Sequence, residues 1–333
     1  MLATPRFWYR RRPTVLARLL QPCGWLYGLA VAWHRRCSTP VVLPVPVVSI
    51  GNLTLGGTGK TPLVIALARE LASRGWRPAV LSRGYGSGRR IPLRVTPALP
   101  VAEVGDEARE LASHLEGIGV WAGRDRLGSA RQAMAAGADL LLLDDGLQHW
   151  RLARDCDVTV LDAVARLGNG LTFPAGPLRE PAAALGRAQL LVLTGPAGTP
   201  AGLPWPAAKP WQAMPARLTL PRQLQQRPLL AFCGIGLPQK FFAALQQQDA
   251  HLVACRTFPD HHPYARADLE RLLAEARDCE NAILVTTGKD WQRLEGLLRP
   301  GEAERIVPLP LQLDPDAVTE LTDQVLQQLA THG

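Results

Sequence analysis

Short apolar runs alternate with segments of helical periodicity through the middle of the 333-residue chain. The first run, Val41–Ile50, is rich in β-branched residues and nearly unbroken by polar ones, which is typical of a strand buried on both faces of a parallel sheet. Further strands are expected at Ala79–Ser82, Asp139–Asp145, Val158–Asp162 and Gln189–Thr194, and helices at Pro62–Arg74, Asp106–His114 and Arg124–Ala136. Strands that alternate with helices predict a doubly wound α/β sheet, in which ligands bind at the carboxyl ends of the strands.

This rhythm stops in a proline-rich segment and then resumes. Pro196–Pro221 holds seven prolines in 26 residues, which indicates a connector or an edge ribbon. After it come an expected strand at Leu229–Cys233, a glycine turn at Gly234–Gly236, a helix at about Pro238–Gln248 and a strand at Ala282–Thr287. We therefore expect a core domain over 37–222, including a connector over 196–222, and a smaller α/β domain over 223–333 that closes a cleft.

The charge of the chain is concentrated at its N-terminus. The net charge is +8, but residues 1–36 hold seven of the 37 basic residues and no acidic one, so the remaining 30 basic residues face 29 acidic ones. A basic, aromatic and apolar start suits an anionic membrane surface, where each Lys or Arg contributes ~1 kcal/mol. Because basic residues do not cluster in the rest of the chain, a nucleic-acid partner is not expected.

The apolar run Leu19–Trp33 lies between these arginines and contains Pro22. If Pro22 ends a helix, the uninterrupted part, 23–33, is about 16 Å long, which is too short to cross a bilayer. The pattern therefore favours an N-terminal helix, within 1–36, that lies at the membrane surface. A helix packed on the protein's own core and a cleaved signal peptide remain alternatives.

The six cysteines form no C-x-x-C pair and do not cluster with histidine. They are expected to be reduced thiols of a cytosolic protein, and no zinc site is predicted.

A glycine-rich loop follows the first strand and precedes the first helix of the core. It reads Thr54-Leu55-Gly56-Gly57-Thr58-Gly59-Lys60-Thr61, close to the G-x-x-x-x-G-K-[ST] phosphate loop but with Thr54 in place of the first glycine. The glycines let backbone N–H groups face phosphate oxygens, Lys60 is expected to reach the β- and γ-phosphates, and Thr61 offers a hydroxyl to Mg²⁺. ATP and Mg²⁺ are therefore the predicted cofactors.

Three kinds of phosphate-loop protein can be weighed from the sequence. A dimeric regulatory ATPase or switch protein carries a signature lysine where this chain has Leu55. A GTPase needs a spacer residue between the lysine and aspartate that read guanine, whereas Lys289 and Asp290 are adjacent. A metal-insertion chaperone of this type needs Cys or His clusters, which are missing from the sequence. The sequence therefore favours a phosphotransferase, with the regulatory ATPase as the alternative interpretation.

A second motif has the form of a magnesium-binding strand end. Leu140–Leu143 is wholly apolar and is followed by Asp144 and Asp145, so a buried strand would deliver two carboxylates to the metal. The segment continues as Gly146-Leu147-Gln148-His149.

These motifs occur in the order found in one family. The chain resembles the tetraacyldisaccharide 4′-kinases of lipid A biosynthesis in the segments Trp25–Gly28, Gly51–Pro62, Ser82–Gly86, Gly105–Glu107, Asp144–His149, Phe173–Glu180 and Asp260–His261. The resemblance covers nearly the whole chain and is thinner after residue 180. That family also carries threonine at the position of Thr54.

The resemblance implies that ATP phosphorylates the 4′-hydroxyl of a tetraacyldisaccharide 1-phosphate to give lipid IVA. It places the reaction, one step of lipopolysaccharide synthesis, at the cytoplasmic face of the bacterial inner membrane, with the enzyme peripheral or monotopic there. The expected partners are the lipid substrate and the membrane surface, with no protein partner implied.

The resemblance also implies roles for particular residues. Asp106 would accept the proton of the sugar hydroxyl, with His261 orienting it or relaying the proton, and Lys60 would complete the catalytic group. Glu107, Asp144 and Asp145, together with Thr61, would serve the metal. Thr54, Gly56, Gly57, Thr58, Gly59, Lys60 and Thr61 would hold the nucleotide, and Arg83, Tyr85, Arg124, His149 and Arg179 are candidates for binding the substrate.

The chain departs from the family pattern in two places. Ala108 replaces a usual proline, which affects only the start of a helix. The common Thr-x-Lys-Asp-Ala sequence appears as Thr287-Gly288-Lys289-Asp290-Trp291.

Overall fold

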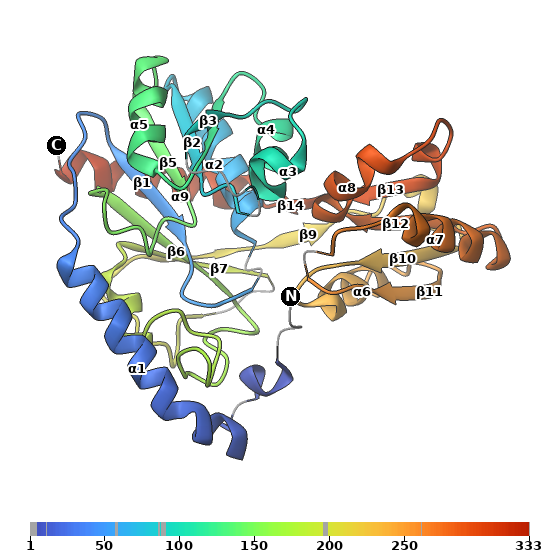
Figure 1. Cartoon of the computed structure of the whole chain (residues 1–333), viewed down its shortest axis with the longest axis horizontal. Helices are drawn as coiled ribbons and strands as arrows, with labels where there is room; N and C mark the ends of the chain where they lie inside the picture. Colours follow the sequence, from blue (N-terminus) through green and yellow to red (C-terminus); the bar gives the residue numbers. More distant parts are fainter. Residues whose placement is uncertain are drawn as a thin grey trace. The chain divides into compact units, whose positions relative to one another are not determined.

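The structure, a computed structural model, describes residues 5–10, 12–56, 59–85, 87, 91–195, 199–260 and 262–332. The chain divides into two compact units. The larger unit comprises Pro5–Ala216 and Leu313–Gly333, and the smaller one comprises Arg217–Gln312. Figure 1 labels the helices and strands of both units.

The larger unit is built on an eight-stranded sheet. Its strands are β1 (Val47–Gly51), β2 (Pro78–Ser82), β3 (Leu93–Arg94), β4 (Gly119–Ala122), β5 (Leu140–Asp144), β6 (Cys156–Asp162), β7 (Leu190–Thr194) and β8 (Trp211–Met214). Their order is β3-β4-β2-β5-β1-β6-β7-β8, and all neighbours are parallel except β3 and β4. The predicted alternation of strand and helix thus yields the expected doubly wound fold, with β1 beside β5 in the sheet.

Helices cover both faces of this sheet. They are η1 (Arg6–Tyr9), α1 (Val15–Cys37), α2 (Lys60–Ser73), α3 (Val101–Val104), α4 (Asp106–His114), α5 (Arg126–Ala135), η2 (Ala182–Arg187) and α9 (Pro315–His332). Alternate residues of β5 point to opposite faces: Leu140 and Leu142 pack in a core with α2, α4 and α9, whereas Leu141 and Leu143 pack in a second core with α5. An apolar strand needs such burial on both faces.

The first predicted strand is shorter than its apolar run. The sequence pattern predicts a strand over Val41–Ile50, but β1 begins only at Val47, and Val41 forms an isolated bridge with Leu152. Pro44 and Pro46 explain the difference, because proline has no N–H to donate to a neighbouring strand.

Helix α9 gives the larger unit a boundary that the sequence did not indicate. The predicted second domain runs to residue 333, whereas α9 belongs to the larger unit. Val318, Leu321 and Val325 enter the core that α2 shares with the sheet, and Gln212 of β8 donates to the Ala317 carbonyl oxygen over 2.7 Å. Helix α9 is thus held on the larger unit by the burial of its apolar side chains.

The N-terminal helix α1 continues through Pro22, which the sequence prediction took as a break. Its 23 residues correspond to about 34 Å, and it is long and apolar enough to cross a membrane by length and composition. Pro22 leaves the carbonyl of Arg18 without its helical partner, and because Arg18 is exposed, water can replace that partner. The length argument for a surface helix therefore fails.

The smaller unit is a second α/β layer structure. Its strands β10 (Leu229–Cys233), β11 (Leu252–Thr257), β12 (Ile283–Thr287) and β13 (Ile306–Leu309) form a parallel sheet in the order β11-β10-β12-β13. Its helices are η3 (Arg222–Leu224), α6 (Pro238–Gln246), α7 (Arg266–Asp278), α8 (Gly288–Leu294), η4 (Glu295–Leu297) and η5 (Ala303–Arg305). A two-stranded sheet of β9 (Ala216–Leu218) and β14 (Leu311–Leu313) lies at the two boundaries of this unit in the sequence. All six cysteines of the chain are free.

Candidate active site

The phosphate loop connects β1 to α2 as the sequence predicts. Gly59 has a φ of +77°, a left-handed conformation that favours glycine, and α2 begins at the next residue, Lys60. Among the described residues no side chain caps this helix start, and Thr61 is buried in its first turn. The first N–H groups of α2 and its dipole thus suit a phosphate. Gly57 and Thr58 lie outside the described residues.

The segment Pro177–Arg179 forms hydrogen bonds with the beginning of the phosphate loop. The Arg179 N–H donates to the Leu53 carbonyl oxygen over 2.7 Å, and the Leu55 N–H donates to the Pro177 carbonyl oxygen over 2.7 Å. Thr54 forms a bridge with Leu178 and is buried, so threonine at this position belongs to a small ladder rather than to an open loop.

Lys60, Asp145 and Arg179 meet at the carboxyl end of β5. The Lys60 Nζ atom lies 3.5 Å from Asp145 Oδ1, and Arg179 Nη1 donates to Asp145 Oδ2 over 2.6 Å. Gln148 joins this group by accepting a hydrogen bond from Arg179 and by donating one to the Asn52 carbonyl oxygen. The register explains the meeting, because Ile50 of β1 pairs with Asp144 of β5.

The two adjacent aspartates have opposite electrostatic surroundings. Burial raises the pKa of Asp144, and the nearby charge of Glu107 raises it further. Burial also acts on Asp145, but the charges of Lys60 and Arg179 outweigh it and hold the pKa of Asp145 far below its usual range. Asp145 is therefore an ionised carboxylate paired with two cations. The ionised form of Asp144, by contrast, needs a further cation to stabilise it.

Sequence reasoning missed Arg126, the first residue of α5. Arg126 is buried, and burial lowers its pKa, while Asp144 and Asp145 act on it in the opposite direction. Its Nη1 atom has no hydrogen-bond partner among the described residues. A buried guanidinium beside the acid cluster is a strong candidate for binding phosphate or substrate oxygen.

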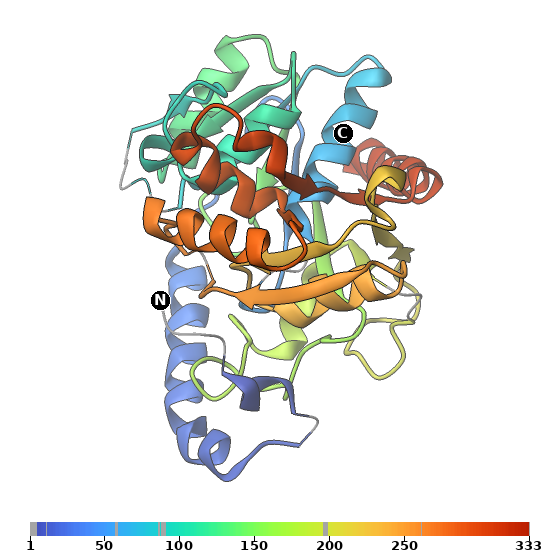
Figure 2. The ribbon, with the colours of Figure 1, turned by 90° about the vertical axis from the view of Figure 1, so that its right-hand side faces the viewer.

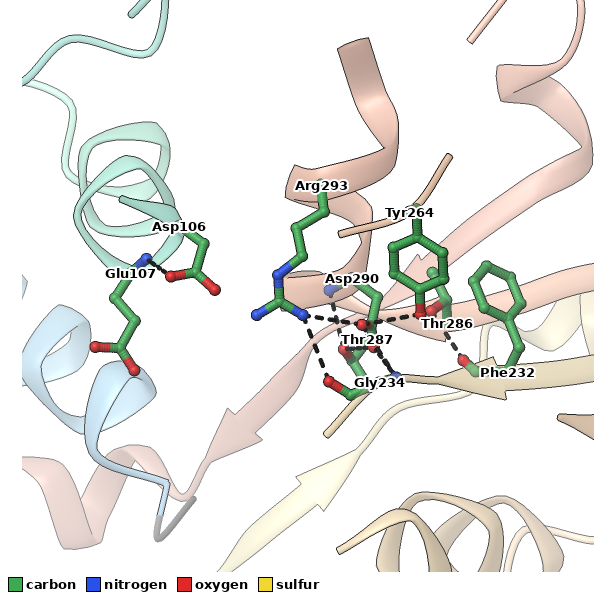
Figure 3. Close-up of polar contacts among 9 residues, drawn as sticks. All are labelled: Asp106, Glu107, Phe232, Gly234, Tyr264, Thr286, Thr287, Asp290 and Arg293. Carbon is green, nitrogen blue, oxygen red and sulfur yellow. Dashed lines mark hydrogen bonds and ion pairs between the residues drawn. The ribbon is translucent and has the colours of Figure 1, made fainter. Parts of the chain in front are cut away.

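The predicted base, Asp106, stands at the start of α4 and is buried. The preceding Gly105 has a φ of +85°, and a Cβ there would lie 2.4 Å from the Tyr85 carbonyl oxygen. Only glycine therefore lets α4 begin against the loop that carries Arg83 and Tyr85. The Glu107 N–H donates to Asp106 Oδ1 over 2.9 Å, which fixes that carboxylate, as Figure 3 shows.

The remaining substrate candidates differ in exposure. Arg83, Tyr85 and Arg124 are exposed at the surface of the larger unit. His149 is half-buried, and burial together with the charge of Arg126 lowers its pKa to about 4, so its imidazole is neutral at pH 7. The Nε2 atom of His149 has no hydrogen-bond partner among the described residues. His261 lies outside the described residues, so its pairing with Asp106 stays a prediction.

The smaller unit buries an aspartate, Asp290, that the sequence left without a role. Its carboxylate is fully buried and accepts hydrogen bonds from the Gly234 N–H, the Tyr264 hydroxyl and the Thr287 hydroxyl at 2.7–3.1 Å, and Arg293 contributes a cation at 3.2 Å (Figure 3). Both carboxylate oxygens of Asp290 are thereby engaged within the unit itself. Asp290 fixes the carboxyl end of β10 to the loop before α7.

The acidic group fits a magnesium ion that is also bound by nucleotide. Within the described part of the chain, no group of three or more His, Cys, Asp and Glu residues is placed to hold a metal alone. Mg²⁺ commonly takes one or two carboxylates together with phosphate oxygens and water. Asp144, with its raised pKa and Glu107 nearby, and the buried Thr61 hydroxyl supply the oxygen donors for such a shared site.

A parallel sheet with a glycine-rich loop before α2, a lysine at the helix start and acids at the end of the neighbouring strand defines a phosphate-loop nucleotide-binding protein of the phosphotransferase kind. A family model described as "Tetraacyldisaccharide-1-P 4'-kinase" matches residues 16–330. The chain belongs to this family of kinases.

Individual relatives agree with this assignment over nearly their whole length. The tetraacyldisaccharide 4′-kinase of Methylobacterium sp. (strain 4-46) is 44% identical, with 95% of this chain and 94% of the relative covered. That of Paramagnetospirillum magneticum is 41% identical, with 96% and 97% covered. A crystal structure described as the "apo" form of LpxK from Aquifex aeolicus in complex with ATP has a TM-score of 0.73 and 27% identity, covering 95% of this chain and all of that one.

Proposed function

We propose that this kinase transfers the γ-phosphate of Mg²⁺-ATP to the 4′-hydroxyl of a tetraacyldisaccharide 1-phosphate, giving lipid IVA, and that it does so at the carboxyl end of β1 and β5. The observation that carries the proposal is the group formed by Lys60, Asp145 and Arg179 beside the start of α2, which no described side chain caps. It offers two cations and a helix N-terminus to a triphosphate, inside a chain of this family.

In this proposal the residues of the larger unit divide the reaction between them. The N–H groups at the start of α2 and the Lys60 ammonium hold the β- and γ-phosphates. Asp145 and Arg179 hold Lys60 in place before the nucleotide arrives. Asp106 accepts the proton of the 4′-hydroxyl as the oxygen–phosphorus bond forms, and ADP leaves with the electron pair of the broken bond. By resemblance to the family, His261 assists Asp106.

Thr61, Glu107, Asp144 and Asp145 are the residues that would hold Mg²⁺. When bound, the ion would neutralise charge on the phosphate oxygens during transfer. Of the two aspartates, Asp144 is the better candidate for a direct ligand, because Asp145 already pairs with Lys60 and Arg179.

Cationic and polar side chains near the carboxyl ends of β1 and β5 would bind the 1-phosphate and the sugars of the substrate. The sequence candidates Arg83, Tyr85, Arg124, His149 and Arg179 belong to this proposal, and the buried Arg126 joins them.

The N-terminal segment is proposed to hold the enzyme at the cytoplasmic face of the inner membrane. One side of α1, with Ala17, Gly24 and Gly28, packs on the larger unit. The other side exposes large apolar side chains, namely Leu19, Trp25, Leu26, Leu29 and Trp33, each more than 60% exposed. An exposed apolar face of this size, flanked by arginines, suits a lipid surface.

The reaction is tested by incubating the full-length protein with Mg²⁺-ATP and the tetraacyldisaccharide 1-phosphate and analysing the lipid by mass spectrometry. One added phosphate on the lipid, lost in Lys60→Ala, supports the proposal. ATP hydrolysis at an equal rate with and without the lipid, and no phosphorylated lipid, would instead identify a regulatory ATPase.

A further inference from the structure

The short helix η1 contacts the entry to the phosphate loop. The Tyr9 hydroxyl donates a hydrogen bond to the Leu55 carbonyl oxygen over 3.2 Å. The same hydroxyl oxygen lies 3.5 Å from the position that a Cβ on Gly56 would take. Burial, reinforced by the charge of Asp162, raises the pKa of Tyr9, so the hydroxyl keeps the proton that it donates.

Helix η1 is itself anchored to the protein by Trp8. The Trp8 side chain is 7% exposed, and its indole N–H donates to the Pro174 carbonyl oxygen over 3.1 Å. Its own carbonyl oxygen accepts from the Asn169 N–H over 2.7 Å, and its ring meets the Phe173 ring edge to face. The position of Tyr9 is therefore fixed by neighbours that are not part of the phosphate loop.

The segment that anchors Trp8 is also held by α1. The Thr172 hydroxyl donates to the Gly24 carbonyl oxygen over 2.7 Å, and the Tyr27 ring packs against Phe173 with centroids 5.6 Å apart. Figures 1 and 2 show η1 and α1, both in dark blue, on the same yellow-green part of the larger unit. Since Pro177 in turn accepts a hydrogen bond from Leu55, the phosphate loop is held through Leu55 from two sides.

We propose that Tyr9 is a positioning residue for nucleotide binding: its hydroxyl holds Leu55 and Gly56 so that the loop is already shaped for the triphosphate. This proposal rests on the proposed function, because it takes the loop after β1 as the ATP site. Tyr9 itself touches no reacting atom. The N-terminal segment then serves the nucleotide as well as the membrane.

The physical reason is preorganisation. A loop that is ordered before binding loses less conformational freedom when it closes on ATP, and its affinity is correspondingly higher. Without the Tyr9 hydroxyl, the nucleotide must order Leu55 and Gly56 itself. Once ATP is bound the loop is held by the phosphates in either case, so the rate of transfer from the bound state should not change.

The test compares Tyr9→Phe with Tyr27→Phe in the full-length protein. Both changes remove one hydroxyl and keep the ring, but only Tyr9 uses its hydroxyl on the loop; the Tyr27 hydroxyl has no hydrogen bond among the described residues. Loss of one neutral hydrogen bond corresponds to a roughly two- to tenfold change in an equilibrium constant. We expect Tyr9→Phe to raise the Kd and the KM for Mg²⁺-ATP by that factor, with kcat and the KM for the lipid unchanged, and Tyr27→Phe to leave all four values unchanged.

Calorimetric titration with Mg²⁺-ATP separates this proposal from the proposed function. A wild-type protein that binds no ATP would overturn the proposed function. If the wild type binds ATP and Tyr9→Phe binds it equally well, the role of Tyr9 is overturned. An equal loss in Tyr27→Phe, or a loss confined to kcat, would also overturn it, because general loosening rather than loop positioning would then be the cause. The thermal midpoint without nucleotide verifies that both variants are folded.

Discussion

Arg179 offers the sharpest test of the group at the end of β5. Its Nη1 atom lies 2.6 Å from Asp145 Oδ2 and 3.2 Å from Gln148 Oε1. Without the guanidinium, Lys60 becomes the one ion-pair partner of Asp145 within the described part of the chain, and the carboxylate draws the lysine away from the phosphates. A hydrogen bond to a charged group contributes about 1.5–3 kcal/mol. Because the two side chains are 21% and 23% exposed, we take the lower part of that range, about 2 kcal/mol.

That value predicts a roughly 30-fold loss of kcat/KM in Arg179→Ala. Arg179→Lys keeps the charge but not the planar fork, so it should recover part of the loss. The assay is transfer of labelled γ-phosphate from ATP to the lipid, with Arg131→Ala, an exposed arginine of α5, as the control. An Arg179→Ala enzyme within twofold of wild type would refute the reasoning. A lysine variant as poor as the alanine variant would show that geometry, not charge, matters.

Three further changes test separate parts of the molecule. Asp106→Asn should lower kcat by at least about a hundredfold and leave the calorimetric Kd for ATP unchanged, because a general base acts in transfer and not in nucleotide binding. The pKa of His149 is 6.5 in the unfolded chain and about 4 in the folded protein, so the unfolded state binds the proton first as pH falls. The free energy of unfolding should therefore decrease between pH 6.5 and 4, by at most about 3 kcal/mol. His149→Gln should remove that part of the pH dependence in urea unfolding, and His251→Gln, at an exposed position, should not. Asp290→Ala should destabilise the smaller unit by about 3–5 kcal/mol, because the Gly234 N–H and the Tyr264 and Thr287 hydroxyls lose their buried charged acceptor. A urea midpoint equal to wild type would contradict this network.

Strands β1, β2, β5, β6 and β7 of the larger unit could be predicted because their residues are almost all buried, whereas β3 and β4 were missed. Leu140–Leu143 has no polar residue, so the strand and its carboxylate end are both visible in the sequence. The helix Asp106–His114 was predicted with the bounds that the structure gives, since Gly105 marks its start. The family and the kinase class were also confirmed, because their motifs are local and keep their order.

Features that depend on contacts distant in sequence could not be predicted in this way. Nothing in the amphipathic pattern of Pro315–His332 says that it packs on α2, about 250 residues earlier in the chain, rather than on the neighbouring smaller unit. The continuation of α1 through Pro22 is similar. Proline opposes a helix locally, but the contacts of Ala17 on one side of it and of Gly24 and Gly28 on the other hold the two halves on one surface.

The start of α5 decides which of two nearby arginines, Arg124 or Arg126, is buried beside the acids. The sequence pattern predicts a helix from Arg124 to Ala136, and Arg124 is separately one of the candidates for binding the substrate. In the structure Asp125 is the N-cap, with its side chain accepting from the Gly128 N–H, and the helix begins at Arg126. Since one residue turns a helix by about 100°, a shift of two residues decides which arginine faces the acids. Arg126 is buried beside Asp144 and Arg124 is exposed, so in this part of the site the capping aspartate, not the helical pattern, identifies the functional candidate.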